Sequence, residues 1–176
     1  LTITYFKLQK KFEEKYGVNT VVLMEIGTFF EVYEVNNEEE QIGKAKEIAE
    51  LLNIQLTRKN KAILENSKEN PIMAGVPAIS LEKHLARIIG EQKYTVVLIR
   101  QKGLPPKVSR YIDTVVSPGT NFDFVIDQDE NNITSLTIDC NKGIFSVGYS
   151  AIDVTTGKCY YNEVHGTSED KNFALD

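Results

Sequence analysis

The stretch Thr20-Val-Val-Leu-Met-Glu-Ile26 constrains the fold more than any other part of the sequence. It is an almost unbroken apolar run of strand length, and Gly27 ends it. A strand with one face in water alternates polar and apolar residues, whereas a strand covered on both faces is apolar throughout. The stretch therefore predicts a central strand of a sheet.

Helical and strand patterns alternate along the first 120 residues. Apolar residues recur at helical spacing in three segments, with short apolar runs between them. The expected helices are 3–16 (core stripe Tyr5, Leu8, Phe12, Tyr16; ended by Gly17), 38–52, and 80–90 with Ser80 as N-cap. The further expected strands are 54–57, 72–74, 94–100 and 111–116. This order predicts an α/β domain, a mixed sheet with flanking helices.

The pattern changes after the turn Ser117-Pro-Gly-Thr120. From there on, helical spacing gives way to short apolar runs joined by turns at 141–143 and 155–157. The runs, which predict an antiparallel meander, are 133–140, 144–153 and 158–164.

The charge distribution changes at the same place. Residues 1–122 hold 17 Lys/Arg and 15 Asp/Glu, whereas residues 123–176 hold 3 and 10. We therefore expect one domain over 1–120 and the beginning of a second over 121–176. Because the chain also lacks an initiator Met, we expect it to be a fragment of a longer protein.

Composition narrows the class of protein. With 176 residues and 41% hydrophobic content, the chain can form one domain, or one domain and part of another. It has no apolar run of about 18 residues and no signal peptide, so we expect an intracellular protein without a membrane partner. The counts and spacings of Cys140, Cys159, His84 and His165 do not resemble a zinc site or a disulfide framework. We expect reduced, partly buried thiols.

Familiar catalytic motifs are missing from the sequence. It contains no GxxxxGK[ST] phosphate loop and no GxGxxG, HExxH or GxSxG motif. No Ser or Cys stands beside a plausible base. We therefore expect a binding module, without catalytic residues, metal or cofactor in this chain.

A Gly-Thr-Phe-Phe-Glu-Val-Tyr stretch beginning at residue 27 is the first candidate binding feature. Strand alternation places Phe30 and Val32 on one face and Phe29, Glu31 and Tyr33 on the other. If the first face is core, the second presents an aromatic ring, a carboxylate and a phenol. Alternatively, both phenylalanines pack on opposite sides of a doubly covered sheet.

Two basic connections are the other candidate features. The loop after the strand at 54–57 carries phosphate-binding residue types, as does Arg110 after the connection 102–107. The loop residues are Thr57, Arg58, Lys59 and Lys61. Both connections are also compatible with ordinary solvated loops, and the prolines of the second with a tight turn.

An aromatic wedge beside basic loops suits a protein that reads deformed duplex DNA. Inserting an apolar side chain between base steps costs roughly a few kcal/mol, and stacking on an exposed base returns about 1–3 kcal/mol. A mispaired base is already poorly stacked, so such a wedge selects defects rather than sequence.

The sequence resembles the MutS family of DNA mismatch-recognition proteins along essentially its whole length. The glycine-led Phe-x-Glu segment at 27–33 is the first of several segments that match the family in order. The others are 51–59 (LLNIQLTRK), 71–77 (PIMAGVP), the helix 81–90, 116–120 (VSPGT) and 149–157 (YSAIDVTTG). Each motif alone is weak, but so many in register are specific.

The resemblance implies a mismatch-recognition domain over 1–120. Over 121–176 it implies the first strands of a connector domain with a ribonuclease-H-like fold. In the family, the Phe of Phe-x-Glu wedges into DNA and stacks on the mispaired base, while the Glu hydrogen-bonds that base. These positions are Phe29 and Glu31, which leaves Phe30 to pack. The basic contacts of the family fall on Arg58, Lys59 and Arg110.

For a full-length protein the resemblance implies further properties. It implies a homodimer that binds ATP and Mg through a C-terminal domain absent here, and that acts on double-stranded DNA with mismatches or small unpaired loops. Other mismatch-repair proteins are implied partners, and a bacterial protein would be cytoplasmic and nucleoid-associated. The fragment itself is expected to bind DNA weakly, because clamp and dimer contacts are missing.

The sequence departs from the family pattern near the candidate site. Thr28 stands where Asp is usual and Phe30 where Tyr is usual. Glu25 stands where Arg is frequent, and Ala78-Ile79 replaces a Tyr-His pair, so both changes remove possible DNA contacts.

Two other classes of function stay open. Asp139 and Asp153 lie on adjacent expected strands, where carboxylates of a nuclease would bind Mg²⁺. The acidic second half also suits a protein-interaction module.

Overall fold

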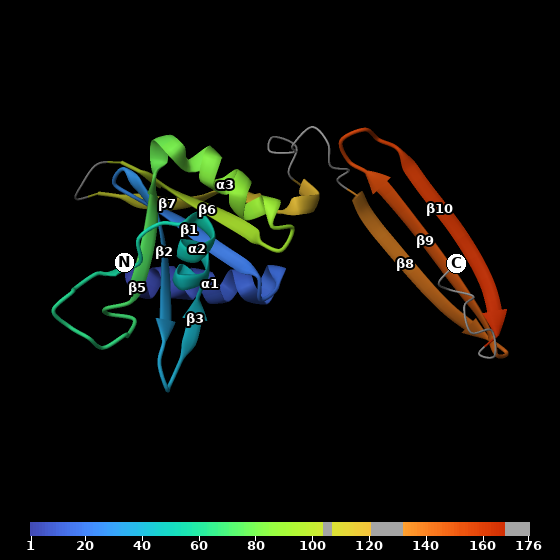
Figure 1. The fold of residues 1–176 in the computed structure, drawn as a ribbon, viewed down its shortest axis with the longest axis horizontal. Helices are drawn as coiled ribbons and strands as arrows, with labels where there is room; N and C mark the ends of the chain where they lie inside the picture. The colour runs from blue at the N-terminus through green and yellow to red at the C-terminus, as the bar shows by residue number, and fades with distance from the viewer. Residues whose placement is uncertain (104–106, 121–131, 168–176) are drawn as a thin grey trace. The chain divides into compact units, whose positions relative to one another are not determined.

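The computed structural model describes residues 1–103, 107–120 and 132–167. The chain forms two compact units, Leu1–Pro118 and Gly119–Asp176. Figure 1 shows helices around a sheet in the first unit and long antiparallel strands in the second. The prolines predicted to set the turn between residues 102 and 107 lie outside the described residues.

The first unit is built on a mixed sheet. Its described strands are β1 (Thr20–Ile26), β2 (Phe29–Asn36), β3 (Gln41–Gly43), β4 (Thr57–Arg58), β5 (Ile72–Pro77), β6 (Thr95–Lys102) and β7 (Ser109–Val116). They run in the order β4-β5-β2-β1-β6-β7, with β3 paired to β2. β1 is antiparallel to β2 and parallel to β6, which confirms the predicted central strand. The other predicted strands of this unit are confirmed too, except that the strand expected at 54–57 is only the two-residue β4, Thr57–Arg58.

Helices cover both faces of this sheet. They are α1 (Thr2–Tyr16), α2 (Ala45–Leu52) and α3 (Leu81–Gly90). On one face, Phe30 and Val32 are buried on the side of α2 and α3, which contact β5. On the other face, Met24 and Tyr33 belong to a buried cluster with Tyr5 and other residues of α1.

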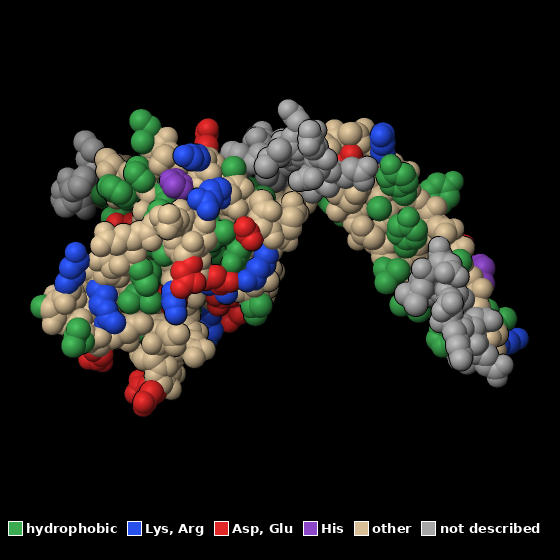
Figure 2. All heavy atoms as spheres, in the orientation of Figure 1, with side chains coloured by type: hydrophobic (Ala, Val, Ile, Leu, Met, Phe, Trp, Pro, Cys, Tyr) green, Lys and Arg blue, Asp and Glu red, His purple; other side chains and the backbone are tan. Residues whose placement is uncertain are grey.

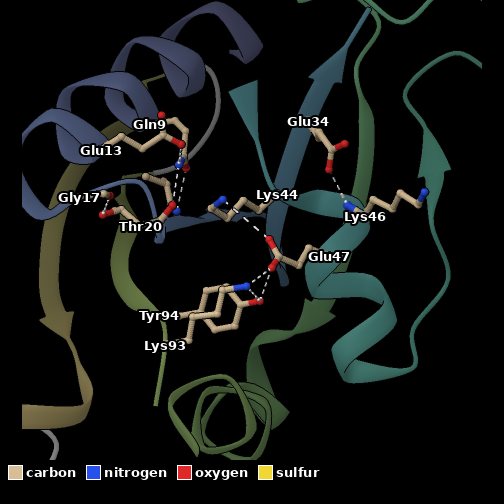
Figure 3. Close-up of polar contacts among 11 residues, drawn as sticks. Gln9, Glu13, Gly17, Thr20, Glu34, Lys44, Lys46, Glu47, Lys93 and Tyr94 are labelled. Carbon is tan, nitrogen blue, oxygen red and sulfur yellow. Dashed lines mark hydrogen bonds and ion pairs between the residues drawn. The ribbon is translucent and has the colours of Figure 1, made fainter. Parts of the chain in front are cut away.

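α1 completes the hydrogen bonding of β1. The ladder between β1 and β2 begins only at Met24, so the first half of β1 lacks a strand on that side. Side chains of α1 take its place (Figure 3): Gln9 Nε2 donates to the Thr20 carbonyl at 2.7 Å, and Gln9 Oε1 accepts the Val22 N–H at 2.9 Å. The Tyr5 hydroxyl donates to the Val22 carbonyl at 2.9 Å. α1 is thereby fixed over one end of the sheet.

The core stripe predicted for α1 is right for Tyr5 and Phe12 and wrong for Tyr16, whose side chain is exposed. Gln9 is fully buried instead. Apolar periodicity does not find such a residue, because a polar amide belongs in a core only where backbone groups need partners.

The prediction of one helix over 38–52 is wrong in its first half. Residues Gln41–Gly43 form β3, which pairs with the end of β2, and α2 follows. Gly43 has a φ of 88°, a left-handed conformation that a helix excludes, and a Cβ there would overlap the Tyr33 carbonyl oxygen.

The beginnings of α2 and α3 differ in their hydrogen bonds. The Glu34 carboxylate accepts the Lys46 N–H at 2.8 Å in the first turn of α2 (Figure 3). Ser80, predicted to cap α3, ends a 3₁₀ turn, η1 (Ala78–Ser80), and its hydroxyl donates to the Pro77 carbonyl at 3.1 Å. Ser80 holds the predicted N-cap position of α3, but its side chain makes no capping hydrogen bond, and α3 itself is confirmed.

The second unit contains a three-stranded antiparallel sheet among its described residues. Its strands are β8 (Asn132–Asn141), β9 (Ile144–Asp153) and β10 (Cys159–Thr167), in the order β10-β9-β8. The predicted meander is confirmed. Lys142 and Gly143 have φ values of 52° and 81°, as a type I′ hairpin turn requires. The assignment of this unit to a ribonuclease-H-like connector domain stays a prediction.

The burial of the two cysteines differs from the prediction. Cys140 and Cys159 are free thiols, as expected, but both are exposed rather than partly buried. All of β8 is exposed. Hydrophobic side chains are correspondingly visible along the unit in Figure 2.

Candidate nucleic-acid interface

A tight hairpin between β1 and β2 forms the tip of the candidate site. Gly27 and Thr28 are its two turn residues, and Gly27 has the positive φ, 62°, that such a turn favours. The Gln101 side chain on β6 accepts the Gly27 N–H at 3.3 Å and donates to the Gly27 carbonyl at 3.0 Å. From the other side, the Ala78 N–H donates to the Thr28 carbonyl at 2.8 Å. Both neighbours of the hairpin therefore hold its tip.

The two phenylalanines after this turn have different environments. Phe30 is fully buried, and the Arg100 guanidinium lies 5.4 Å from the centre of its ring. Phe29, directly behind the turn, is 44% exposed. The alternative in which both rings pack in the core is therefore wrong, and Phe30 is the packing ring.

Phe29 and Glu31 lie on the sheet face that α1 covers, but beyond the end of α1. We call this uncovered part of the face the open end. Strand alternation and ladder register give its other members, because Gln101 follows the cluster residues Val97 and Ile99 on one face of β6 and pairs with Arg110. The open end comprises Phe29, Glu31, Gln101 and Arg110. Thr57 is on the same face, but it pairs with Met73, which pairs with Tyr33 and packs against the α1 cluster, so it lies level with the covered end.

Glu31 and Tyr33 form a hydrogen-bonded pair at the edge of the open end. The Tyr33 ring is buried under α1 rather than presented as predicted, and its hydroxyl donates to Glu31 Oε2. Burial raises the pKa of Glu31 above its ordinary value, against the opposing effects of the Tyr33 hydrogen bond and the Lys59 charge. Glu31 therefore releases its proton at a higher pH than an exposed glutamate does.

Gly75 leaves space beside Glu31. It stands opposite Glu31 in the ladder between β2 and β5. A Cβ at Gly75 would lie 3.3 Å from Glu31 Cγ and 3.3 Å from the Phe30 carbonyl oxygen, tighter than ordinary contact. The missing side chain therefore helps to determine where Glu31 stands.

The predicted basic residues divide between two places. Lys59 is close enough to Glu31 to lower its pKa, and Arg110 is close enough to Tyr33 to do the same there. Arg58 pairs with Ile72, on the opposite face from Thr57, and its guanidinium donates to the Leu64 carbonyl. Lys61 lines a hollow together with Thr57 and Arg58. The structure thus places Lys59 and Arg110 near the Glu31–Tyr33 pair, and groups Thr57, Arg58 and Lys61 around the hollow.

Sequence reasoning missed the roles of several residues around the tip. Ile79 is 99% exposed, and it follows Ala78, whose N–H holds the hairpin turn. An exposed apolar side chain thus stands next to a residue that holds the tip. Gln101 and Gly75 gave no signal, because their roles depend on neighbours that only the sheet register brings together.

The carboxylates considered for a nuclease do not form a site. Asp139 pairs with Ser146, and Asp153 lies seven residues further along β9, which is about 24 Å at about 3.4 Å per residue. The Asp153 carboxylate accepts hydrogen bonds from Thr155 and Thr156, as turn chemistry requires. No group of three metal-binding side chains occurs in the described part of the chain. The nuclease interpretation therefore fails on geometry.

None of the helices that the structure describes is both long and apolar enough to span a membrane.

Comparison with known proteins gives the family. The family model of MutS domain I matches residues 4–125. Over 98% of its length, the chain is 32% identical to a DNA mismatch repair protein mutS homolog of Acanthamoeba polyphaga mimivirus. It is 29% and 28% identical, over 93% and 95% of its length, to the DNA mismatch repair proteins MutS of Fusobacterium nucleatum and Halothermothrix orenii. The chain spans 16% to 17% of the length of these relatives. It therefore belongs to the MutS family and carries its domain I.

Proposed function

We propose that this chain recognises mispaired or unpaired bases in kinked duplex DNA, through the open end of its sheet. One observation carries the proposal: an exposed aromatic ring, Phe29, stands at a rigid hairpin tip beside a half-buried carboxyl group, in a chain of MutS domain I. An apolar ring held out in this way suits insertion between base steps. The relatives are named as DNA mismatch repair proteins, and the proposal extends that role to this chain.

The rigidity of the tip supports the wedge role of Phe29. A ring that enters the base stack must resist the force of restacking. Hydrogen bonds from Gln101 and Ala78 fix the turn residues directly before Phe29. Because the tip is preorganised, little conformational entropy is lost when DNA binds.

Glu31 supplies the polar contact to the displaced base. When it is ionised, its carboxylate accepts an N–H from a base edge. When it is protonated, it donates to a ring nitrogen, and the raised pKa of Glu31 brings this second form closer to neutral pH. Comparing mismatch affinity across pH for wild type and Glu31→Gln separates the two forms. Identical pH profiles would argue against proton donation.

Lys59 and Arg110 suit contacts to the DNA backbone. Both cations lie near the Glu31–Tyr33 pair, so phosphates flanking a wedged base come within their reach. Thr57, Arg58 and Lys61 keep the same role in the proposal, but on a neighbouring stretch of backbone.

The activity of a complete protein is part of the proposal. The relatives are about six times longer than this chain, as the 16% to 17% coverage shows. We propose that domains outside the chain bind ATP and Mg, form a homodimer and contact other repair proteins. Residues 121–176 would then begin the connector domain between domain I and those parts.

The decisive experiment compares two duplexes of one sequence, one matched and one with a single unpaired T, by fluorescence anisotropy of the intact protein at fixed salt. Phe29→Ala should reduce the preference for the unpaired T by roughly fivefold or more, since stacking contributes about 1–3 kcal/mol. Tyr16→Ala, which removes another exposed aromatic ring, is the matched control and should leave the preference unchanged.

Other results would favour other functions. Equal binding to both duplexes, whether or not Phe29 is present, would mean that a MutS-like fold binds DNA here without reading mismatches. Absence of DNA binding by the intact protein would favour a protein-interaction module.

A further inference from the structure

The ring of Tyr33 has a fixed position. It is buried under α1 and makes a T-shaped contact with Tyr5, with ring centres 4.8 Å apart and an interplanar angle of 69°. Tyr5 is itself held, because its hydroxyl donates to the Val22 carbonyl at 2.9 Å. The Tyr33 hydroxyl therefore stands at a defined point where the cover of α1 ends and the open end begins.

This hydroxyl is a permanent donor to Glu31. Burial and the hydrogen bond to Glu31 raise the pKa of Tyr33, as Tyr5 also does, while the charge of Arg110 lowers it. The net direction is upward from a phenol's already high value, so Tyr33 keeps its proton at physiological pH. Its single proton is donated to Glu31 Oε2.

The other neighbours of Glu31 offer no competing hydrogen bond. Lys59 acts on Glu31 through its charge, and the residues beside Glu31 in the two adjacent strands, Met24 and Gly75, are uncharged. Among the described residues, Tyr33 supplies the one hydrogen bond that Glu31 accepts. Oε1 is thus the oxygen left for a ligand.

We infer that Tyr33 is a positioning residue that selects which oxygen of Glu31 meets the mispaired base. With Oε2 bound to the phenol, Oε1 accepts a base N–H when Glu31 is ionised, and Oε1 carries the proton when Glu31 is neutral. A single oxygen in one place then serves both protonation states. This inference deepens the proposed function and rests on it.

The first test needs no DNA. Tyr33→Phe keeps the ring and removes the hydroxyl, and the Glu31 carboxyl is titrated by carbon NMR in the 176-residue chain. Because a hydrogen bond to a carboxylate favours its charged form, its loss should raise the pKa of Glu31. Tyr94→Phe is the matched control, since Tyr94 donates to a different carboxylate, Glu47, at 2.7 Å. It should leave the Glu31 titration unchanged.

The second test measures the preference of the intact protein for the unpaired T against pH. Tyr33→Phe should lower this preference roughly two- to tenfold, the range expected for one hydrogen bond. It should also move the pH dependence of mismatch binding to higher pH. In a Glu31→Gln background, Tyr33→Phe should produce no such movement.

Two outcomes would overturn the inference. An unchanged Glu31 titration in Tyr33→Phe would show that the hydroxyl does not act on the carboxyl group. A shifted titration with unaltered mismatch preference, in a protein whose preference Phe29→Ala abolishes, would show that the pair does not act on the base. The Phe29→Ala result alone tests the proposed function, so the two failures are distinguishable.

Discussion

The two ends of one sheet face share the same strands and differ in what covers them. At the covered end, Met24 and Tyr33 lie under α1 and are buried. At the open end, Phe29 and Glu31 continue the same alternation in β2, yet one is exposed and the other half-buried. The cause is where α1 docks, because Gln9 fixes the helix to the unpaired half of β1.

The comparison teaches how a binding site arises from a core face. The alternation of a strand decides which face a side chain joins, but it does not decide whether another layer covers that face. Here, α1 does not extend over the open end of the sheet face, which leaves an aromatic ring and a carboxyl group uncovered. Because α1 does not cover these two residues, nearby side chains fix them instead. Gln101 hydrogen-bonds to Gly27 at the tip, and Tyr33 donates to Glu31 at the boundary.

Removing one ring from each end should give the largest contrast. Phe6 of α1 is buried in the core cluster, so Phe6→Ala should lower the free energy of unfolding by about 3–5 kcal/mol. Phe29→Ala should change it by less than about 0.5 kcal/mol, because the ring is exposed. Urea denaturation of the two variants measures the difference. Equal destabilisation would mean that Phe29 contributes to the core and that the ends are not distinct.

Loosening the tip should have a smaller effect. Gln101→Ala removes both side-chain hydrogen bonds to Gly27 and should lower the free energy of unfolding by about 1 kcal/mol. It should also weaken the preference for the unpaired T, because Phe29 loses its rigid base. Gln41→Ala, at an exposed position in β3, is the control and should change neither. A Gln101→Ala variant with full mismatch preference would mean that the wedge needs no preorganised tip.

Much of the fold can be predicted from local patterns, and the failures share a cause. The central strand and the meander follow from apolar runs and alternation, whereas the packing of Phe30 follows from the family resemblance. The predicted helix at 38–52 begins too early. Its sequence does not reveal that Gly43 lies against the Tyr33 backbone in a left-handed conformation. Gln9 was missed because its burial depends on the point where the ladder between β1 and β2 stops.

The candidate site could be predicted only in part, for a similar reason. The positions proposed for the wedge and the carboxyl group, Phe29 and Glu31, follow from the Phe-x-Glu segment and its resemblance to the family. The separation of Arg58 from Lys59 depends on the ladder between β4 and β5, which the sequence does not reveal. The exposure of Cys140 in β8 and Cys159 in β10 depends on what covers these strands, which the apolar pattern of each strand does not reveal.

The two loop lysines offer a further way to sharpen the comparison. Lys59 lies near Glu31, whereas Lys61 lines a hollow with Thr57 and Arg58. Lys59→Ala should reduce the slope of log affinity against log salt by about 1, since one phosphate contact is lost. Lys61→Ala, which removes the same charge, should reduce it less. The intact protein on the unpaired-T duplex, titrated over several salt concentrations, measures both slopes; equal reductions would assign both lysines to the interface.

The smallest expected effect concerns Glu31 and stability. Its pKa is raised in the folded chain, so the neutral form is favoured there: any stabilisation is full below the ordinary glutamate pKa, which is about 4.3. It is lost as pH rises through the raised folded pKa. Glu31→Gln, which can still accept from Tyr33, should therefore stabilise the chain at neutral pH, by about 0.5 kcal/mol or less for a half-exposed group. The advantage should vanish in acid. Urea denaturation of both proteins across pH measures it, and a Glu31→Gln variant that is less stable than wild type at neutral pH would mean that the ionised carboxylate strengthens the open end rather than straining it.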